Sequence, residues 1–155
     1  MSQNPVTGIE EYEAAISIGR GDSRKHRRSA IYEYNFSREG GAIGTFFLRG
    51  PSLPEGAVLV GSYIDVVTVP TSGGAATIGL GIVTTTDLNA EDAISGAPWS
   101  STGLVDPDAG PEEGTESGYI KITSANPRQV RATVGTAALT AGRFFVVIAY
   151  DVLDS

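Results

Sequence analysis

Runs in which apolar and polar side chains alternate cover most of the chain, and this pattern is typical of half-buried β-strands. The clearest run is SAIYEYNFS, residues 29–37, in which four apolar side chains share one face: Ala30, Tyr32, Tyr34 and Phe36. Further strands are expected where Val, Ile, Thr and aromatic residues gather between Gly and Pro. These runs span residues 42–50, 56–70, 75–86, 117–125, 128–136 and 142–152, with a weaker one at 14–19.

The same runs predict which side chains form the core. Residues 56–70 and 142–152 are apolar on both faces, so the pattern does not decide which of their faces points inward. Gly79 and Gly81 alternate with large apolar residues, which indicates that another backbone approaches that face closely. The residues that we expect to be largely buried are Val58, Val60, Ile64, Val66, Ile78, Leu80, Ile82, Phe145, Val147 and Ile148.

The connecting segments complete the predicted architecture. In LNAEDAISGAPW, residues 88–99, Asn89 can cap one helical turn because acidic residues follow it. Residues 101–116 lack apolar periodicity and are rich in Gly, Pro and acid, so we expect a long exposed loop. About eight short strands predict an all-β domain, a jelly-roll or Greek-key β-sandwich. We assign residues 29–155 to the sandwich and residues 1–28 to an N-terminal arm.

Length and composition fit one domain that folds without disulfide bonds. The chain has 155 residues and no cysteine, and a chain of this length buries roughly 70% of the surface that its unfolded form exposes. No apolar run approaches the ~20 residues of a membrane-spanning helix, and the first residues do not have the pattern of a signal peptide. We therefore expect a soluble protein that does not associate with membranes.

Positive and negative charges are separated along the chain. The segment GRGDSRKHRR, residues 19–28, is rich in cations, whereas residues 50–120 contain no Lys or Arg. Its RGD tripeptide matches an integrin-binding motif, but three-residue matches arise often by chance. The net charge of −7 argues against a general nucleic-acid-binding domain, which is usually basic.

This basic segment is interpreted as a partner-binding tether. Arginine binds carboxylates in bidentate geometry, so we favour a protein partner or the protein's own acidic surface. Phosphate contacts to nucleic acid are the weaker alternative. The tether cations are Arg20, Arg24, Lys25, Arg27 and Arg28.

No combination of residues in the sequence indicates catalysis. The single histidine, His26, lies within the basic segment, so a Ser-His-Asp triad would have to recruit it from the arm. The acidic residues of the 101–116 loop and its flank offer oxygens of the kind that bind Ca²⁺, but they lack EF-hand spacing and a solvated loop explains them. They are Asp106, Asp108, Glu112, Glu113 and Glu116. We expect no enzyme activity, no metal and no cofactor.

Asp65 interrupts the otherwise apolar run of residues 56–70. A charge at this place either keeps an edge strand from pairing with other chains or binds an arginine. Both explanations are preferred over a catalytic acid.

Two stretches resemble small structural proteins of tailed bacteriophages, of the kind that decorate or cement the capsid. They are LPEGAVLVGSYIDV, residues 53–66, and LTAGRFFVVIAY, residues 139–150, and the resemblance as a whole covers residues 40–152. It implies a β-sandwich located on the surface of the virion capsid, commonly a homotrimer, that binds the outside of the major capsid protein lattice. Such proteins carry no catalytic residues that could be transferred to this chain.

Two other kinds of function remain open. Another virion part, such as a head fibre base, a head–tail connector or a tail protein, has similar sequence features. A carbohydrate-binding β-sandwich would use exposed aromatic rings, and the candidates are Trp99, Tyr63 and Tyr119. Trp99 follows Pro98, however, and is more simply explained as a side chain that plugs a loop onto the core. Oligomerisation, as a trimer, would also cover exposed strand edges.

Overall fold

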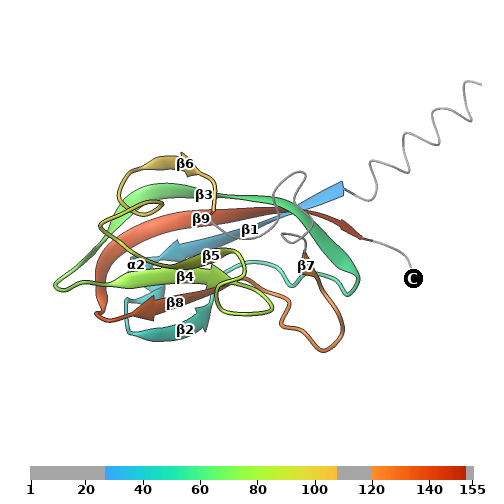
Figure 1. Cartoon of the computed structure of the whole chain (residues 1–155), viewed down its shortest axis with the longest axis horizontal. Coiled ribbons are helices and arrows are strands. Elements are labelled where there is room, and N and C mark those ends of the chain that lie inside the picture. The colour runs from blue at the N-terminus through green and yellow to red at the C-terminus, as the bar shows by residue number, and fades with distance from the viewer. Residues whose placement is uncertain (1–26, 108–119, 153–155) are drawn as a thin grey trace, which may run out of the picture.

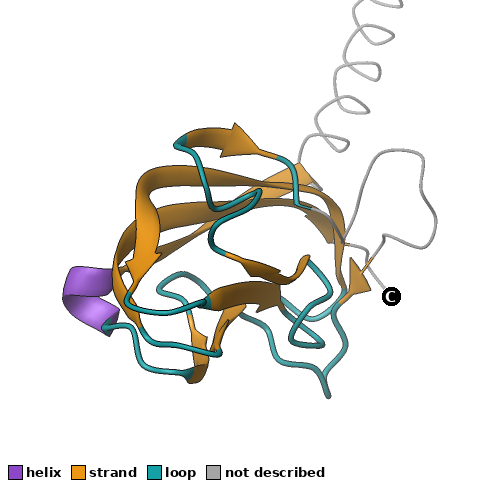
Figure 2. Ribbon diagram, turned by 60° about the vertical axis from the view of Figure 1, so that its left-hand side comes forward, coloured by secondary structure: helices purple, strands orange, loops and turns teal. Residues whose placement is uncertain are grey.

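The structure is a computed structural model that describes residues 27–107 and 120–152, and it is a sandwich of two antiparallel sheets (Figures 1 and 2). The larger sheet has the order β1 (Arg27–Asn35), β9 (Leu139–Val152), β3 (Ala57–Ser72) and β6 (Gly103–Val105), with β7 (Ile120–Lys121) also paired to β3. The smaller sheet has the order β2 (Gly44–Phe47), β8 (Arg131–Gly135), β4 (Thr77–Gly81) and β5 (Asn89–Ala93). One helical turn, α2 (Phe36–Glu39), follows β1.

The strands pair in a nested order. With the two-residue strand β7 set aside, β1 pairs with β9 and β2 with β8, while β3 pairs with β6 and β4 with β5. The chain thus forms one long hairpin of paired strands, and this hairpin is wound so that its strand pairs fall alternately in the two sheets. This is the winding that a jelly roll requires. The predicted all-β sandwich is confirmed.

Strand β1 binds the rest of the fold through two buried tyrosines. The hydroxyl of Tyr32 donates a hydrogen bond of 2.6 Å to the carbonyl of Pro51, and that of Tyr34 donates one of 2.6 Å to Gly40. Burial raises the pKa of Tyr34 to about 12. With Ala30, which is also buried, these residues confirm the face predicted from the alternation in residues 29–37.

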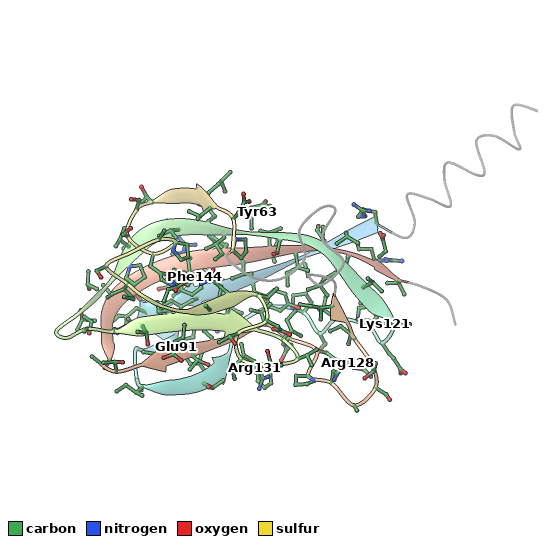
Figure 3. All side chains as sticks on the ribbon, viewed as in Figure 1. Tyr63, Glu91, Lys121, Arg128, Arg131 and Phe144 are labelled. Atoms are coloured by element: carbon green, nitrogen blue, oxygen red, sulfur yellow. The ribbon has the colours of Figure 1, made fainter. Side chains whose placement is uncertain are left out.

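The core lies between the two sheets and is rich in aromatic rings. Phe144 is at its centre, with its ring centroid 5.2 Å from that of Tyr34 and 4.8 Å from that of Trp99. Figure 3 shows Phe144 between the layers. The predicted core residues Ile64, Val66, Ile78, Leu80, Ile82 and Ile148 are all fully or almost fully buried.

Four predicted core residues are wrong, and two of them lie next to a β-bulge. In β3, Leu59 pairs with Tyr150 and Gly61 pairs with the next residue along β9, Ala149, so Val60 is an extra residue. An extra residue reverses which side chains face the core. Inward positions are therefore odd-numbered before the bulge and even-numbered after it, and Val58 and Val60 are only partly buried.

The other two errors lie in β9. Its inward face consists of even-numbered residues from Phe144 to Tyr150, so Phe145 and Val147 point outward and are only partly buried. The run FFVVI is apolar at every position, so alternation offers no sign of the inward face. The register, which pairs Val146 with Ile64, settles it.

Two connecting segments also differ from the prediction. Residues 89–93 form strand β5 in place of a helical turn, and Asn89 is fully buried there with its amide bonded to Asp92 and Ala90. Part of the expected loop at 101–116 forms strand β6, which pairs with Ile64 to Val66. Local propensity predicted a turn and a loop, but pairing with β4 and β3 determines the strand conformation.

The close backbone approach predicted at two glycines is confirmed. A Cβ at Gly79 would lie 3.3 Å from the Cα of Glu91, and one at Gly81 would overlap the carbonyl oxygen of Thr84. The weak strand predicted at residues 14–19 lies outside the described residues.

Candidate functional site

The outward face of the larger sheet carries two rows of side chains that cross its strands. The register aligns Ile31 of β1 with Val147 of β9 and Tyr63 of β3. The neighbouring row aligns Glu33, Phe145, Asp65 and Leu104. Val67, which is 41% exposed, follows Asp65 closely in β3, at a register irregularity between Val66 and Thr68. We call the apolar members of these rows the outer apolar face: Ile31, Tyr63, Val67, Leu104, Phe145 and Val147.

This face concentrates the exposed apolar side chains of the domain. Among the described residues six large apolar side chains are exposed, and four of them lie on the outer apolar face. Ile31 is 56% exposed, Tyr63 42% and Leu104 72%. Figure 3 shows Tyr63 on the side of the larger sheet that faces away from the smaller one. Contiguous exposed apolar side chains of this kind mark interaction sites.

One end of the outer apolar face has a compact group of ion pairs. Glu33 accepts a hydrogen bond of 2.6 Å from Nη2 of Arg38 and one of 2.7 Å from Nε of Arg143. The guanidinium of Arg143 also lies 5.1 Å from the centroid of the Phe145 ring, a cation–π distance. The hydrogen bonds from Arg38 and Arg143 lower the pKa of Glu33. Glu39 lies 3.8 Å from Nε of Arg38 and 3.9 Å from Nε of Arg49, so the charged side chains at this end are paired within the chain.

Glu33 should give the fold a defined acid sensitivity. Its carboxylate titrates near 4.5 in the unfolded chain and at a lower pH in the folded one. The ion pairs therefore stabilise the fold fully above pH 4.5, and this contribution is lost as the pH falls through the folded-state pKa. We expect the melting temperature of the wild type to fall more steeply on acidification than that of Glu33→Gln.

Calorimetry between about pH 7 and 3 measures this difference. Glu55→Gln is the matched control, because the Glu55 side chain is 60% exposed and lies 3.8 Å from Arg128, so it should follow the wild-type curve. Parallel curves for the wild type and Glu33→Gln would contradict the assignment.

The opposite end of the face also has an ion pair within the chain. Nε of Arg27 donates a hydrogen bond of 2.7 Å to Asp151, and its Nη2 donates a longer one of 3.4 Å. Arg27 is the first described residue and already lies in β1, so this predicted tether cation is bound within its own chain. Arg28 lies in β1 beside it and is exposed. Arg20, Arg24, Lys25 and His26 lie outside the described residues.

Asp65 is the one charge in the middle of these rows. It lies between Phe145 and Leu104, and within the described part of the chain it forms no hydrogen bond or ion pair. β3 is flanked at this point by β9 and β6, so Asp65 is not on an edge strand, and that interpretation is wrong because it was made without knowing the strand order. No described arginine pairs with Asp65, and Arg20 and Arg24 lie outside the described residues.

The smaller sheet has a different outward face. Hydroxyl groups of Thr45 and Thr133 are hydrogen-bonded at 2.9 Å, and Thr77 donates to Glu91 at 2.7 Å. Glycines fill several of the remaining positions. Phe47, 53% exposed, is the large apolar side chain on this face, and it is paired with Arg131. This side of the sandwich is mostly polar.

The described residues offer little for catalysis or sugar binding. Within residues 27–107 and 120–152 no three His, Cys, Asp or Glu side chains gather into a possible metal site, and no helix is long and apolar enough to cross a membrane. Asp106 is exposed, whereas the other acidic loop residues named above and Tyr119 lie outside the described residues. Trp99 is fully buried and cannot serve as a sugar-binding platform, so its interpretation as a core plug is confirmed.

The sequence contained a signal for the outer apolar face, but the alternation of apolar and polar residues was not enough to identify it. Strands β3 and β9 are apolar on both faces, and for that reason the pattern did not decide which face points inward. Only one sheet covers them, so the second apolar face is exposed. Apolarity on both sides of a strand at the outside of a sandwich therefore indicates a contact surface.

Comparison with known proteins shows a likeness of fold. No family model and no curated protein sequence matches this chain. A chain in the capsid asymmetric unit of cyanophage Pam1 is similar over 82% of this chain and 85% of its own length, with a TM-score of 0.57 and 17% identity. A chain in the acid-stable capsid structure of Helicobacter pylori bacteriophage KHP30 is similar over 82% and 88%, with a TM-score of 0.55 and 19% identity.

Proposed function

We propose that this chain is a structural protein of a bacteriophage virion, and that it decorates the capsid by binding the outer surface of the major capsid protein lattice. The observation that carries the proposal is the match to two chains of phage capsids. Each neighbour is covered over 85% or more of its length, so each is about as long as this chain. The similarity therefore concerns whole small chains and not one domain of a large shell protein.

Three further observations support a role in surface contact. The larger sheet exposes an apolar face, which a protein acting alone in water does not need. The sequence-based resemblance to decoration proteins was drawn from residues 40–152, which make up most of the described domain. The described residues bring together no group that would indicate an enzyme. In this role the protein is a homo-oligomer, a trimer by the same resemblance, that adds contacts across the lattice and so stabilises it.

The proposal is tested by adding the purified protein to capsids that lack it. Sedimentation with the particles, a fixed copy ratio and density on the outer surface in electron microscopy are expected. Binding should also raise the temperature at which the capsids open, because a ligand of the closed lattice stabilises it. Density only at a vertex, a connector or a tail would replace decoration by another virion role, and no binding to any particle would refute both.

The basic segment is proposed to be the tether in this attachment. Substitution of its cations by alanine should weaken binding to capsids, and binding should weaken with salt because exposed charges are screened beyond about 8–10 Å. Arg27 stays unchanged, since its loss would also break the pair with Asp151. The four substituted residues are Arg20, Arg24, Lys25 and Arg28.

Asp22→Ala is the control, because it removes the RGD tripeptide and no cation. It should bind capsids as the wild type does. Unchanged capsid occupancy for the fourfold variant would exclude the tether, and a loss of DNA retention instead would favour a nucleic-acid arm.

A further inference from the structure

We propose that the outer apolar face is the surface through which two copies of this chain contact each other. One face that meets itself gives a two-fold contact, so the proposed contact joins two copies and does not by itself form the trimer of the proposed function. It needs no contribution from the capsid.

The face is continuous and of suitable size. Its rows run across β1, β9, β3 and β6 without a break in the register at these positions. Three strands ~4.8 Å apart and the nine residues of β1 at ~3.4 Å rise give about 15 by 30 Å, or about 450 Å², for the apolar face together with its polar border on the larger sheet. A standard interface takes ~800 Å² from each partner. The sheet face supplies over half of this area, and the adjoining β6 and α2 extend it.

The charge distribution favours a second copy as the occupant. The chain carries a net charge of −7, so copies repel each other over most of their surface. On this face and at its border Arg38 and Arg143 bind Glu33, and Arg27 binds Asp151. Arg38 and Arg49 also lie 3.8 Å and 3.9 Å from Glu39, so four cations face four carboxylates when Asp65 is counted. Two acidic molecules meet with least repulsion where their charges are already balanced. An apolar centre with a polar border is also the usual composition of an interface.

The polar groups at the centre allow such a contact. An unpaired carboxylate enclosed by apolar groups opposes association unless a donor faces it. The Tyr63 hydroxyl forms no hydrogen bond within the described residues, and Tyr63 lies two residues from Asp65 on the same face. A second copy on this face thus brings both a donor and an acceptor, Tyr63 and Asp65. The smaller sheet offers no comparable row, since its threonines are bonded to one another or to Glu91.

The first experiment measures the mass of the full chain in solution by light scattering and sedimentation. The wild type is expected to be oligomeric at micromolar concentration. Tyr63→Glu should raise the dissociation constant by about 100-fold, as enclosing an unpaired charge does. Phe47→Glu is the matched control, because it places the same charge at an exposed aromatic position on the smaller sheet, and it should remain oligomeric.

A second experiment does not depend on a disruptive substitution. The chain has no cysteine, so Ile31→Cys and Phe47→Cys each introduce a single thiol. Maleimide should label Cys at position 31 several-fold more slowly at high protein concentration than at low concentration. At position 47 the rate should not depend on concentration.

Other results would overturn the proposal or separate it from the proposed function. A wild-type monomer at micromolar concentration excludes this contact, and so does dissociation by Phe47→Glu but not by Tyr63→Glu. If Tyr63→Glu keeps the wild-type mass but loses capsid binding, the face belongs to a capsid subunit instead. If the wild type is oligomeric through this face but binds no particle, the proposed function fails and the contact between copies stands.

Discussion

Replacing Trp99 by alanine should destabilise the fold by about 3–5 kcal/mol. The indole is fully buried and packs 4.8 Å from the Phe144 ring, centroid to centroid. Its Nε1 donates a hydrogen bond of 3.2 Å to the carbonyl of Ile78 in β4. The side chain thus joins a loop, the smaller sheet and the central ring of the core, and alanine leaves a cavity where all three meet.

Chemical denaturation followed by circular dichroism measures this effect, because Trp99 is the only tryptophan and its fluorescence is lost with it. Trp99→Phe keeps a ring and removes the N–H. It should destabilise the fold by about 1–3 kcal/mol, clearly less than alanine does, because it leaves the Ile78 carbonyl unsatisfied and places a smaller ring in the core. Leu104→Ala is the surface control, since Leu104 is 72% exposed, and it should stay within about 0.5 kcal/mol of the wild type. A Trp99→Ala variant as stable as Leu104→Ala would show that the indole does not pack in the core.

The second large effect is expected from Val146→Ala, at about 2–3 kcal/mol. Val146 is fully buried and pairs with Ile64 in the centre of the larger sheet. Its neighbour Val147 points to the opposite face, so Val147→Ala should cost less than about 1 kcal/mol, mostly through lower strand propensity. The two substitutions remove the same atoms from the same strand and differ only in the face they affect.

Both variants are compared by denaturant unfolding at low protein concentration, so that contacts between copies do not contribute. An equal loss of unfolding free energy in the two variants would mean that β9 has no single inward face. A larger cost for Val147→Ala would mean that the register of β9 against β3 is shifted by one residue.

The sequence predicted strands well where one face is apolar and the other polar. In β1 and β4 the alternation identified both the strand and its inward face, because large apolar side chains occupy every second position and the positions between them are polar or glycine. In β3 and β9 it identified the strands but not the faces. Val58 and Val60 were misplaced because a bulge shifts the alternation, and one extra residue in an apolar run leaves no mark in the composition.

The candidate contact surface was harder to predict than the fold. Ile31, Tyr63 and Leu104 come from three strands that are far apart in sequence, and only the strand order brings them into adjacent rows. Short-range signals such as the basic segment were visible at once, whereas a surface made by pairing distant strands was not. The same reason explains Asp65, whose position could not be judged before β6 was known to pair with β3.

The pairing of the first described strand with the last affects how the chain reaches its fold during synthesis. Arg27 and its partner Asp151 are 124 residues apart, and a ribosome needs about 6–25 s to translate that distance. During this time β1 has no β9 to pair with, and the tyrosines on its buried face remain in water. The larger sheet can therefore close only after β9 has been synthesised and has left the ribosome, and folding should be slow and dominated by long-range contacts. A nascent chain halted before β9 should be cleaved readily by protease in β1, even where the β4–β5 hairpin has already formed.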